Sequence, residues 1–279
     1  MKQCLQVAQA LMDFSRALAS DRSLEHEYYP GMEPKNWEAT QQAHQELLDL
    51  MKAPKPRSWG IHVSEVTKGP GWHCDLWIWY SLLAEKEPVT LWDAGSIRNF
   101  WIGDALHQWL LPRVVPALLY KYRERLEIVD VRIEWGVVSG LLTGHADLYL
   151  SYILDGVPAS VVIDLKSTSE SMHNKRVRKK AKLSSPQRIR EVEAEPHYRR
   201  QLATYVDLLD ADYGLLVYWI KQFPHEMEQV HVPLSLRLLG TIRKRIDGNA
   251  YGSSAPAATR GAHCTECPFF NQCEADHAQ

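Results

Sequence analysis

Two charged residues, Asp164 and Lys166, end an otherwise apolar segment of the chain, residues 161–166. Side chains alternate along a strand, so residues two apart lie on one face. A carboxylate and an ammonium beside a buried strand are costly unless they pair, bind a metal ion or reach an exposed sheet edge. This spacing therefore indicates a site for chemistry, and a solvated salt bridge at a sheet edge is the alternative.

A third acidic residue, Asp147, belongs to the preceding strand-like segment. The turn signal Asp155-Gly156 predicts a hairpin that places Asp147 across from the Asp164 region. Two carboxylates that close repel each other unless a divalent cation lies between them. Oxygen ligands of this kind suit Mg²⁺ or Mn²⁺, which can activate water and stabilise charge on a phosphate oxygen.

The elements that would position these residues are strands in the middle of the chain and helices around them. Alternation and β-branched residues predict strands at residues 126–138, 144–154, 159–165, 213–221 and 227–232. Apolar spacing predicts helices at residues 1–52, with a break near 28–34, and at 72–84, 96–123, 198–209 and 234–246. We expect an α/β fold, with a central mixed β-sheet of about five strands flanked by helices.

Composition limits the class of protein. The chain has 279 residues, of which 45% are hydrophobic and 24% charged, and this balance excludes a disordered chain. No apolar run approaches the roughly 20 residues of a membrane span. An odd number of cysteines, five, argues against a disulfide framework and favours the cytoplasm. We expect three segments: an N-terminal helical extension (1–56), a core (57–249) and a Cys-rich tail (250–279).

The order of the charged residues resembles the PD-(D/E)xK nuclease superfamily, and within it the RecB-type branch. Asp147 and the run Asp164-Leu165-Lys166 match its acidic core. The branch also carries a helix histidine, a glutamate before the first aspartate and a Gln-x-x-x-Tyr motif, matched here by His107, Glu134, Gln201 and Tyr205. The resemblance implies a restriction-endonuclease-like core that hydrolyses DNA phosphodiester bonds with Mg²⁺ or Mn²⁺.

The resemblance also implies a role for each matched residue. Four groups would bind the metal ion: His107, Asp147, Asp164 and the carbonyl oxygen of Leu165. The catalytic set would comprise both aspartates together with Lys166, Glu134, Gln201 and Tyr205. An imidazole ligand favours Mn²⁺ over Mg²⁺. His145, two positions before Asp147, is left outside this predicted site.

Three cysteines in the tail, Cys264, Cys267 and Cys273, have the spacing of a metal motif. The fourth ligand is either His277, which would complete a zinc site, or Cys74. Some RecB-type nucleases, including CRISPR-associated adaptation exonucleases and AddB subunits, carry one cysteine before the helix histidine and three near the C-terminus. By this resemblance Cys74 joins the tail cysteines in a [4Fe–4S] cluster, with zinc as the alternative.

A basic segment without acidic residues follows the strand that ends at Lys166. Its cations are Lys175, Arg176, Arg178, Lys179, Lys180, Lys182, Arg188 and Arg190. Its place beside the predicted active site favours DNA binding, and phosphate contacts would make that binding salt-dependent. A solvated loop is the alternative.

The resemblance narrows the expected activity to an exonuclease on single-stranded DNA ends. The expected setting is recombination, phage DNA processing or CRISPR adaptation in the cytoplasm of a bacterial or phage-infected cell. Because the sequence has no Gly-x-x-x-x-Gly-Lys-Ser/Thr motif, any unwinding would come from a helicase or another protein partner. The alternatives are a non-catalytic DNA-binding scaffold and a structure-specific endonuclease.

Overall fold

The computed structural model describes most of the predicted core. The described residues are 5–21, 23–28, 60–67, 74–83, 94–169, 195–221, 227–232, 236–250, 255–261, 264–265, 267 and 269–277. The basic segment 175–190 and the predicted boundary at residue 56 lie outside them. Within the described part, no helix combines the length and apolar character needed to cross a membrane.

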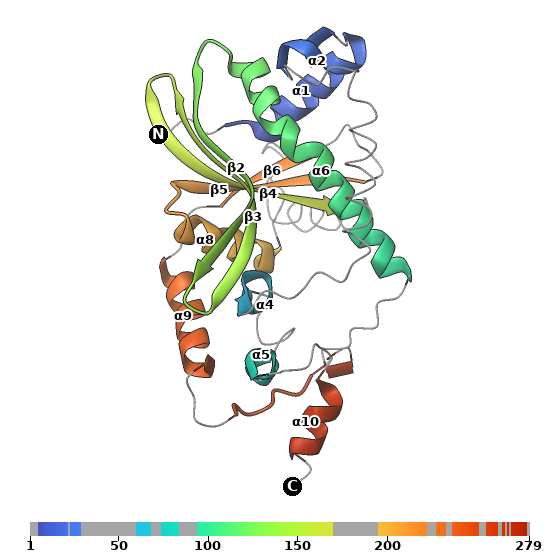
Figure 1. Ribbon diagram of the computed structural model, residues 1–279, viewed down its shortest axis with the longest axis vertical. Helices are drawn as coiled ribbons and strands as arrows, with labels where there is room; N and C mark the ends of the chain where they lie inside the picture. The colour runs from blue at the N-terminus through green and yellow to red at the C-terminus, as the bar shows by residue number, and fades with distance from the viewer. Residues whose placement is uncertain are drawn as a thin grey trace, which may run out of the picture.

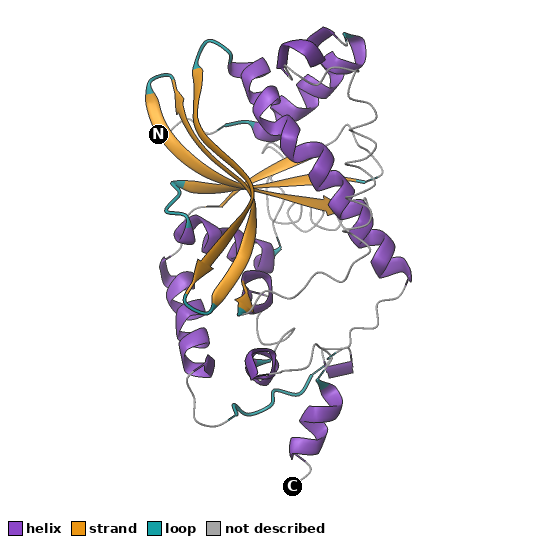
Figure 2. Cartoon of the chain, in the orientation of Figure 1, coloured by secondary structure: helices purple, strands orange, loops and turns teal. Residues whose placement is uncertain are grey.

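A mixed six-stranded sheet forms the centre of the fold (Figures 1 and 2). Its strands are β1 (Ile61–His62), β2 (Leu126–Ser139), β3 (Leu142–Leu154), β4 (Val157–Thr168), β5 (Tyr213–Ile220) and β6 (Met227–Val232). Their order is β1-β3-β4-β5-β6, with β2 paired to β3. The β1–β3 and β4–β5 pairs are parallel, and the others are antiparallel. All five predicted strands are confirmed, and β1 is an addition of two residues.

Helices cover both faces of this sheet. The described helices are α1 (Val7–Ser20), α2 (Ser23–Tyr28), α4 (Val63–Thr67), α5 (Asp75–Leu83), α6 (Ala94–Tyr122), α8 (Pro196–Leu208), α9 (Leu236–Ala250) and α10 (Phe270–His277). Of these, α10 lies away from the sheet (Figure 1). Helices α1 and α6 share one buried cluster with the sheet, the α6-side core, which includes Phe14, Leu118 and Leu150. Helices α4, α5, α8 and α9 share a second, the α8-side core, which includes Ile78, Ala146 and Leu202. The predicted α/β architecture is confirmed.

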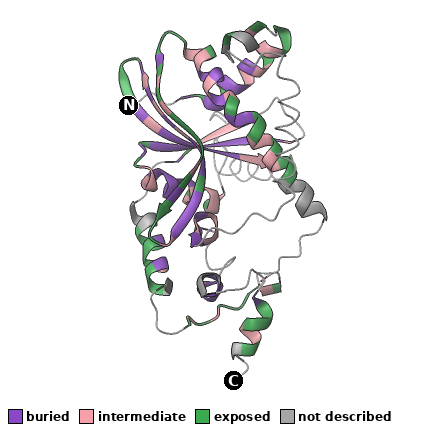
Figure 3. Ribbon diagram, in the orientation of Figure 1, coloured by how far each residue is buried: buried purple, intermediate pink, exposed green. Residues whose placement is uncertain are grey.

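The first helix is part of the packed structure (Figure 3). Phe14 is fully buried in the α6-side core. On β6, the Gln229 side chain donates a hydrogen bond to the carbonyl oxygen of Leu5 at 2.8 Å and accepts one from the Ala8 N–H at 3.2 Å. These contacts join the N-terminal segment to a strand that lies far away in sequence.

The hairpin between β3 and β4 sets the register of the central strands. Asp155 and Gly156 both have positive φ, 53° and 76°, as a two-residue type I′ turn requires. The antiparallel pairing that starts at this turn ends with Leu148 opposite Ile163. One step further, the same register places Asp147 opposite Asp164, as the turn signal predicts.

Beyond that last pair, β3 leaves β4 and changes the layer against which it packs. Ala146 belongs to the α8-side core, whereas Leu148 belongs to the α6-side core. The change falls at Asp147, which is 7% exposed. The two strands therefore separate at the acidic pair, and this fork is where the candidate site lies.

Candidate active site

Three potential metal ligands from three elements meet beside the fork. Ligand atoms of His107 on α6, Glu134 on β2 and Asp147 on β3 all lie within 4.8 Å of one another. His107 Nδ1 is 3.4 Å from a Glu134 carboxylate oxygen, and His107 Nε2 is 3.7 Å from Asp147 Oδ2. Glu134 has a φ of 48°, an uncommon conformation for a residue with a side chain. We call these three residues the acidic triad.

The backbone of Leu165 connects the acidic triad to β4. Its N–H donates a hydrogen bond of 2.7 Å to Asp147 Oδ2. Its carbonyl oxygen accepts a hydrogen bond of 2.9 Å from His107 Nε2. The N–H and the carbonyl group of Leu165 thus hold β3 and α6, respectively, against β4. The carbonyl oxygen of Leu165 also lies next to the potential metal ligands of the acidic triad.

On the neighbouring positions of β4, the buried Asp164 and the half-buried Lys166 form an ion pair. Lys166 Nζ lies 3.0 Å from Asp164 Oδ1 and 2.9 Å from Oδ2. It also lies 5.2 Å from the centre of the Tyr198 ring on α8, within range of a cation–π contact. Burial opposes the charge on Lys166, but the carboxylates of Asp164 and Asp147 raise its pKa above the usual value. The lysine is therefore a fixed cation.

The acidic triad holds protons tightly in this structure. Burial alone would lower the pKa of His107, but the hydrogen bond to Glu134 and the charge of Asp147 raise it to about 9. Burial and the nearby charge of Asp164 raise the pKa of Asp147 to about 7. The raised pKa values of Asp147 and His107 both show that added positive charge is favoured at this position.

Helix α8 presents the Gln201–Tyr205 motif to the same fork. Tyr205 is fully buried, and its burial and the charge of Asp164 raise the pKa of its hydroxyl. A Cβ atom at Gly144 on β3 would lie 2.7 Å from the Tyr205 hydroxyl oxygen. Because glycine has no side chain at this position, Tyr205 can pack directly against β3. Gly144 is therefore required for the geometry of the site.

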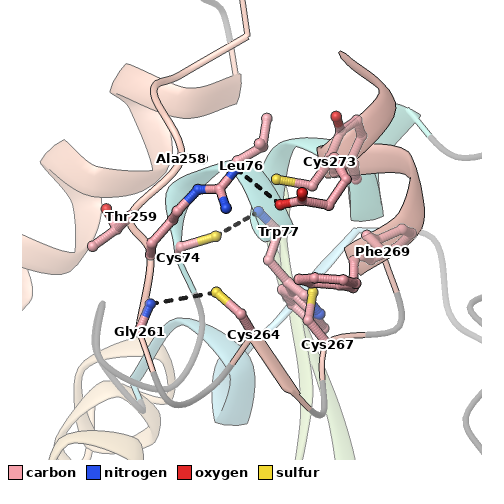
Figure 4. Close-up of a pocket in the computed structure, with 14 residues that line it drawn as sticks. Cys74, Leu76, Trp77, Ala258, Thr259, Gly261, Cys264, Cys267, Phe269 and Cys273 are labelled. Atoms are coloured by element: carbon pink, nitrogen blue, oxygen red, sulfur yellow. Dashed lines mark hydrogen bonds and ion pairs between the residues drawn. The ribbon is translucent and has the colours of Figure 1, made fainter. Parts of the chain in front are cut away.

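A second group of potential ligands lies away from the fork, at the end of the molecule that holds α5 and α10 (Figure 1). Figure 4 shows this group in close-up. A cavity of about 220 Å³ is lined by four cysteines together with apolar side chains such as Phe269. The four are Cys74, Cys264, Cys267 and Cys273. The side chain of His277, the alternative fourth ligand, lies outside the described part of the chain.

Two of these cysteines accept backbone hydrogen bonds, and burial changes the pKa of a third. The N–H of Trp77 donates to Cys74 Sγ at 3.4 Å, and the N–H of Gly261 donates to Cys264 Sγ at the same distance. Burial raises the pKa of the Cys267 thiol, and the three neighbouring cysteines raise it further. Four sulfur donors that face one enclosed space form a set suited to a soft metal or an iron–sulfur cluster.

Comparison with known proteins decides the family. The model of the PD-(D/E)XK nuclease superfamily matches residues 81–274, which is most of the chain and contains the whole fork. The chain belongs to this superfamily. No curated protein matches the chain.

Solved structures are similar to this nuclease-superfamily chain at low sequence identity. SSO0001 is 18% identical, with 85% of this chain and 96% of that chain covered and a TM-score of 0.41. LHK-Exo from Laribacter hongkongensis in complex with dAMP is 9% identical, with 78% and 93% covered and a TM-score of 0.42. A phage-related exonuclease from Haemophilus somnus 129PT is 12% identical, with 81% and 89% covered and a TM-score of 0.35.

The structure brings the predicted catalytic and metal-binding residues of this nuclease-superfamily member to the fork, whereas the predicted DNA-binding residues lie outside the described part of the chain. It adds Glu134, predicted as catalytic, to the group of metal-ligand candidates with His107 and Asp147. Asp164, also predicted as a metal ligand, contacts Lys166 through its carboxylate. Gly144 opens the Gly-x-x-Asp run that ends at Asp147 and has no predicted role of its own; the structure shows that it makes room for Tyr205.

Proposed function

We propose that this chain is a Mg²⁺- or Mn²⁺-dependent deoxyribonuclease of the RecB-type branch that acts as an exonuclease on single-stranded DNA ends. The observation that carries the proposal is the junction at Leu165. There, the backbone of Leu165 joins Asp147 and His107, while its neighbours Asp164 and Lys166 form an ion pair. Membership of the nuclease superfamily supports this assignment of chemistry.

The donor atoms at the fork fit a hard divalent cation. Carboxylate oxygens, a backbone carbonyl oxygen and one imidazole are ligands that Mg²⁺ and especially Mn²⁺ accept. The residues that would hold the ion are His107, Asp147, Asp164, Glu134 and the carbonyl of Leu165. When bound, the ion supplies Lewis-acid stabilisation of a phosphate and activates a water molecule.

The chain's own residues would orient the substrate and balance its charge. Lys166, held by Asp164 and the Tyr198 ring, offers a fixed positive charge to the phosphate that is cleaved. Tyr205 and Gln201, which lie on α8, would hold the residues of the fork in position. The basic segment 175–190 would contact phosphates along the strand.

We also propose that the four cysteines hold a [4Fe–4S] cluster. The cavity supports this because its lining gathers Cys74 with the three tail cysteines, as the cluster requires. The cluster would bind the tail (250–279) to the nuclease core (57–249), with residues 1–56 as a helical extension. Anaerobic purification should give about four iron atoms per chain, whereas one zinc and no iron would contradict the cluster.

The activity itself is tested with linear and covalently closed single-stranded DNA in Mn²⁺. The wild-type chain should degrade the linear strand and leave the circle intact, and Asp164→Ala should abolish cleavage while it still binds DNA. Cleavage of the circle would replace the exonuclease with an endonuclease. A wild-type chain that binds DNA and cleaves no end type would favour a scaffold instead.

The proposed setting is the cytoplasm of a bacterial or phage-infected cell, beside a recombination, helicase or CRISPR-adaptation protein. Co-purification of the tagged chain with such a partner, and its loss after deletion of the partner gene, is the measurement that checks this part. If the purified chain alone degrades free DNA ends as fast as it does with the partner added, the proposal of a partner protein would be weakened.

A further inference from the structure

Two histidines lie beside the candidate active site, and neither belongs to its donor set. His62 is on β1 and His145 is on β3. Their ring centres are 6.5 Å apart, and their planes are tilted by only 28°. His145 is exposed and His62 is half-buried. Two flat, nearly parallel aromatic rings at a solvent-facing position form a surface on which another flat ring can stack.

Both rings lie on the α6 side of the sheet, as the acidic triad does. Gly144 faces Tyr205 of α8, and Ala146 packs in the α8-side core, so the residue between them faces the other way. Ile61 is fully buried in the α8-side core, so the next residue of β1, His62, also faces away from α8. His107 of the triad belongs to α6 itself.

The histidine pair is close to the triad along the strands. His145 is two residues before Asp147 on β3, a separation of about 7 Å along an extended strand. Opposite His145 on β2 is Gly136, two residues after Glu134. A Cβ atom at Gly136 would lie 3.6 Å from the imidazole of His145. Because glycine has no side chain, position 136 places no atoms above the sheet surface between the acidic triad and the histidines.

The second ring is held in position by its neighbours. His62 Nδ1 lies 2.8 Å from the Ser64 hydroxyl oxygen and 3.4 Å from the Ser64 N–H. The backbone N–H of His62 donates a hydrogen bond of 3.0 Å to the Glu65 carboxylate. A ring that is already fixed loses little conformational freedom when a ligand binds, so it favours binding.

We propose that the His62–His145 pair is a stacking site for one nucleobase of the DNA strand, next to the nucleotide whose phosphate lies at the acidic triad. Imidazole rings are among the side chains on which unpaired bases stack. Every base offers a flat face, so such a site holds a single strand in register without reading its sequence. The inference rests on the proposed function, since it takes single-stranded DNA as the substrate.

The test compares single-turnover cleavage in Mn²⁺ of end-labelled single strands that carry one abasic nucleotide at successive positions. His145→Ala should weaken binding of intact DNA about tenfold, with a smaller effect on the maximal rate. His145→Phe keeps a stacking ring and should restore binding to within about twofold of wild type, whereas His145→Gln keeps a polar group and should not. His231→Ala is the matched control, because His231 is an exposed histidine on β6 that stacks on Tyr213 at 5.3 Å, and this variant should bind as wild type does.

The abasic series separates stacking from a phosphate contact. At one position next to the cleaved bond, removal of the base should weaken wild-type binding, and His145→Ala should then add no further loss. Equal losses for His145→Ala on intact and abasic strands at every position would overturn the stacking site, as would rescue by glutamine instead of phenylalanine. Both results leave the nuclease itself intact. A wild-type chain that cleaves no DNA would overturn the proposed function, and the inference with it.

Discussion

At the scale of single residues, protons and a metal ion compete for the same atoms. His107 Nε2 donates to the Leu165 carbonyl oxygen, while Nδ1 contacts the Glu134 carboxylate. Both ring nitrogens can donate only in the charged imidazolium. This explains in structural terms why the pKa of His107 rises to about 9 against the effect of burial. The carboxyl of Asp147, with a pKa of about 7, holds a second proton.

The affinity for Mn²⁺ should therefore rise with pH between about 6 and 9. Below a pH of about 7 both His107 and Asp147 are protonated, and the cation must displace both protons to use these ligands. Between 7 and 9 only the His107 proton remains to be displaced. Calorimetry in buffers of different ionisation enthalpy measures the released protons. An affinity that stays constant across this range would show that these two groups are not ligands.

At the scale of elements, the fork depends on how closely β3 and α8 approach each other. The strand passes the helix at Gly144, where the Tyr205 hydroxyl lies 2.7 Å from the place a Cβ atom would occupy. Tyr205 is fully buried and cannot swing into solvent without opening the α8-side core. This close approach therefore fixes the distance between the motif helix and Asp147.

Gly144→Ala should lower the free energy of unfolding by about 1–3 kcal/mol, the usual cost of forcing an extra atom into a packed site. It should also reduce nuclease activity, because Tyr205 or β3 must shift. Urea denaturation and a cleavage assay measure the two effects. Gly103→Ala on α6 is the control, since among the described residues no atom beyond its chain neighbours and the nearby backbone of its own helix lies within 4 Å of the added Cβ, and alanine favours a helix. Equal stability of both variants would show that the contact carries no strain.

The elements were also the level at which the sequence was most informative. Alternation located β2 to β6 within a few residues, and the Asp155-Gly156 turn alone predicted the register that sets Asp147 opposite Asp164. The position of Glu134 beside His107 could not be predicted, because it depends on where α6 crosses β2 and on a positive φ inside a strand. The two-residue strand β1 is too short to give a periodic signal, so the partner of His145 was missed as well.

At the scale of the whole molecule, the cysteine cavity joins the first part of the predicted core to the predicted tail. Cys74 comes just before α5, and the other three cysteines come from the last part of the chain. A metal group that bridges them closes a long loop and restrains the unfolded chain, which stabilises the fold. The tail spacing predicted a metal site, and the fold brings Cys74 to the three tail cysteines.

Cys267→Ser should therefore lose most of the bound iron and unfold at a lower temperature than wild type. Serine is a poor ligand for iron, and the loss of one of four cysteines leaves the site incomplete. Iron analysis and thermal unfolding of anaerobically purified protein measure both effects. Cys4→Ser is the control and should keep the iron of wild type. Equal iron in the two variants would contradict the four-cysteine site.

The central claim is that the fork at Leu165 hydrolyses DNA, and the most direct measurement is the single-turnover cleavage rate of Lys166→Gln, with its Mn²⁺ binding measured alongside. Glutamine can still bond to Asp164 but carries no charge. We expect Mn²⁺ to bind as in wild type while the cleavage rate falls about 10²–10³-fold, the usual cost of removing one stabilising group. A rate within a few fold of wild type, with Mn²⁺ binding retained, would place the chemistry elsewhere in the chain.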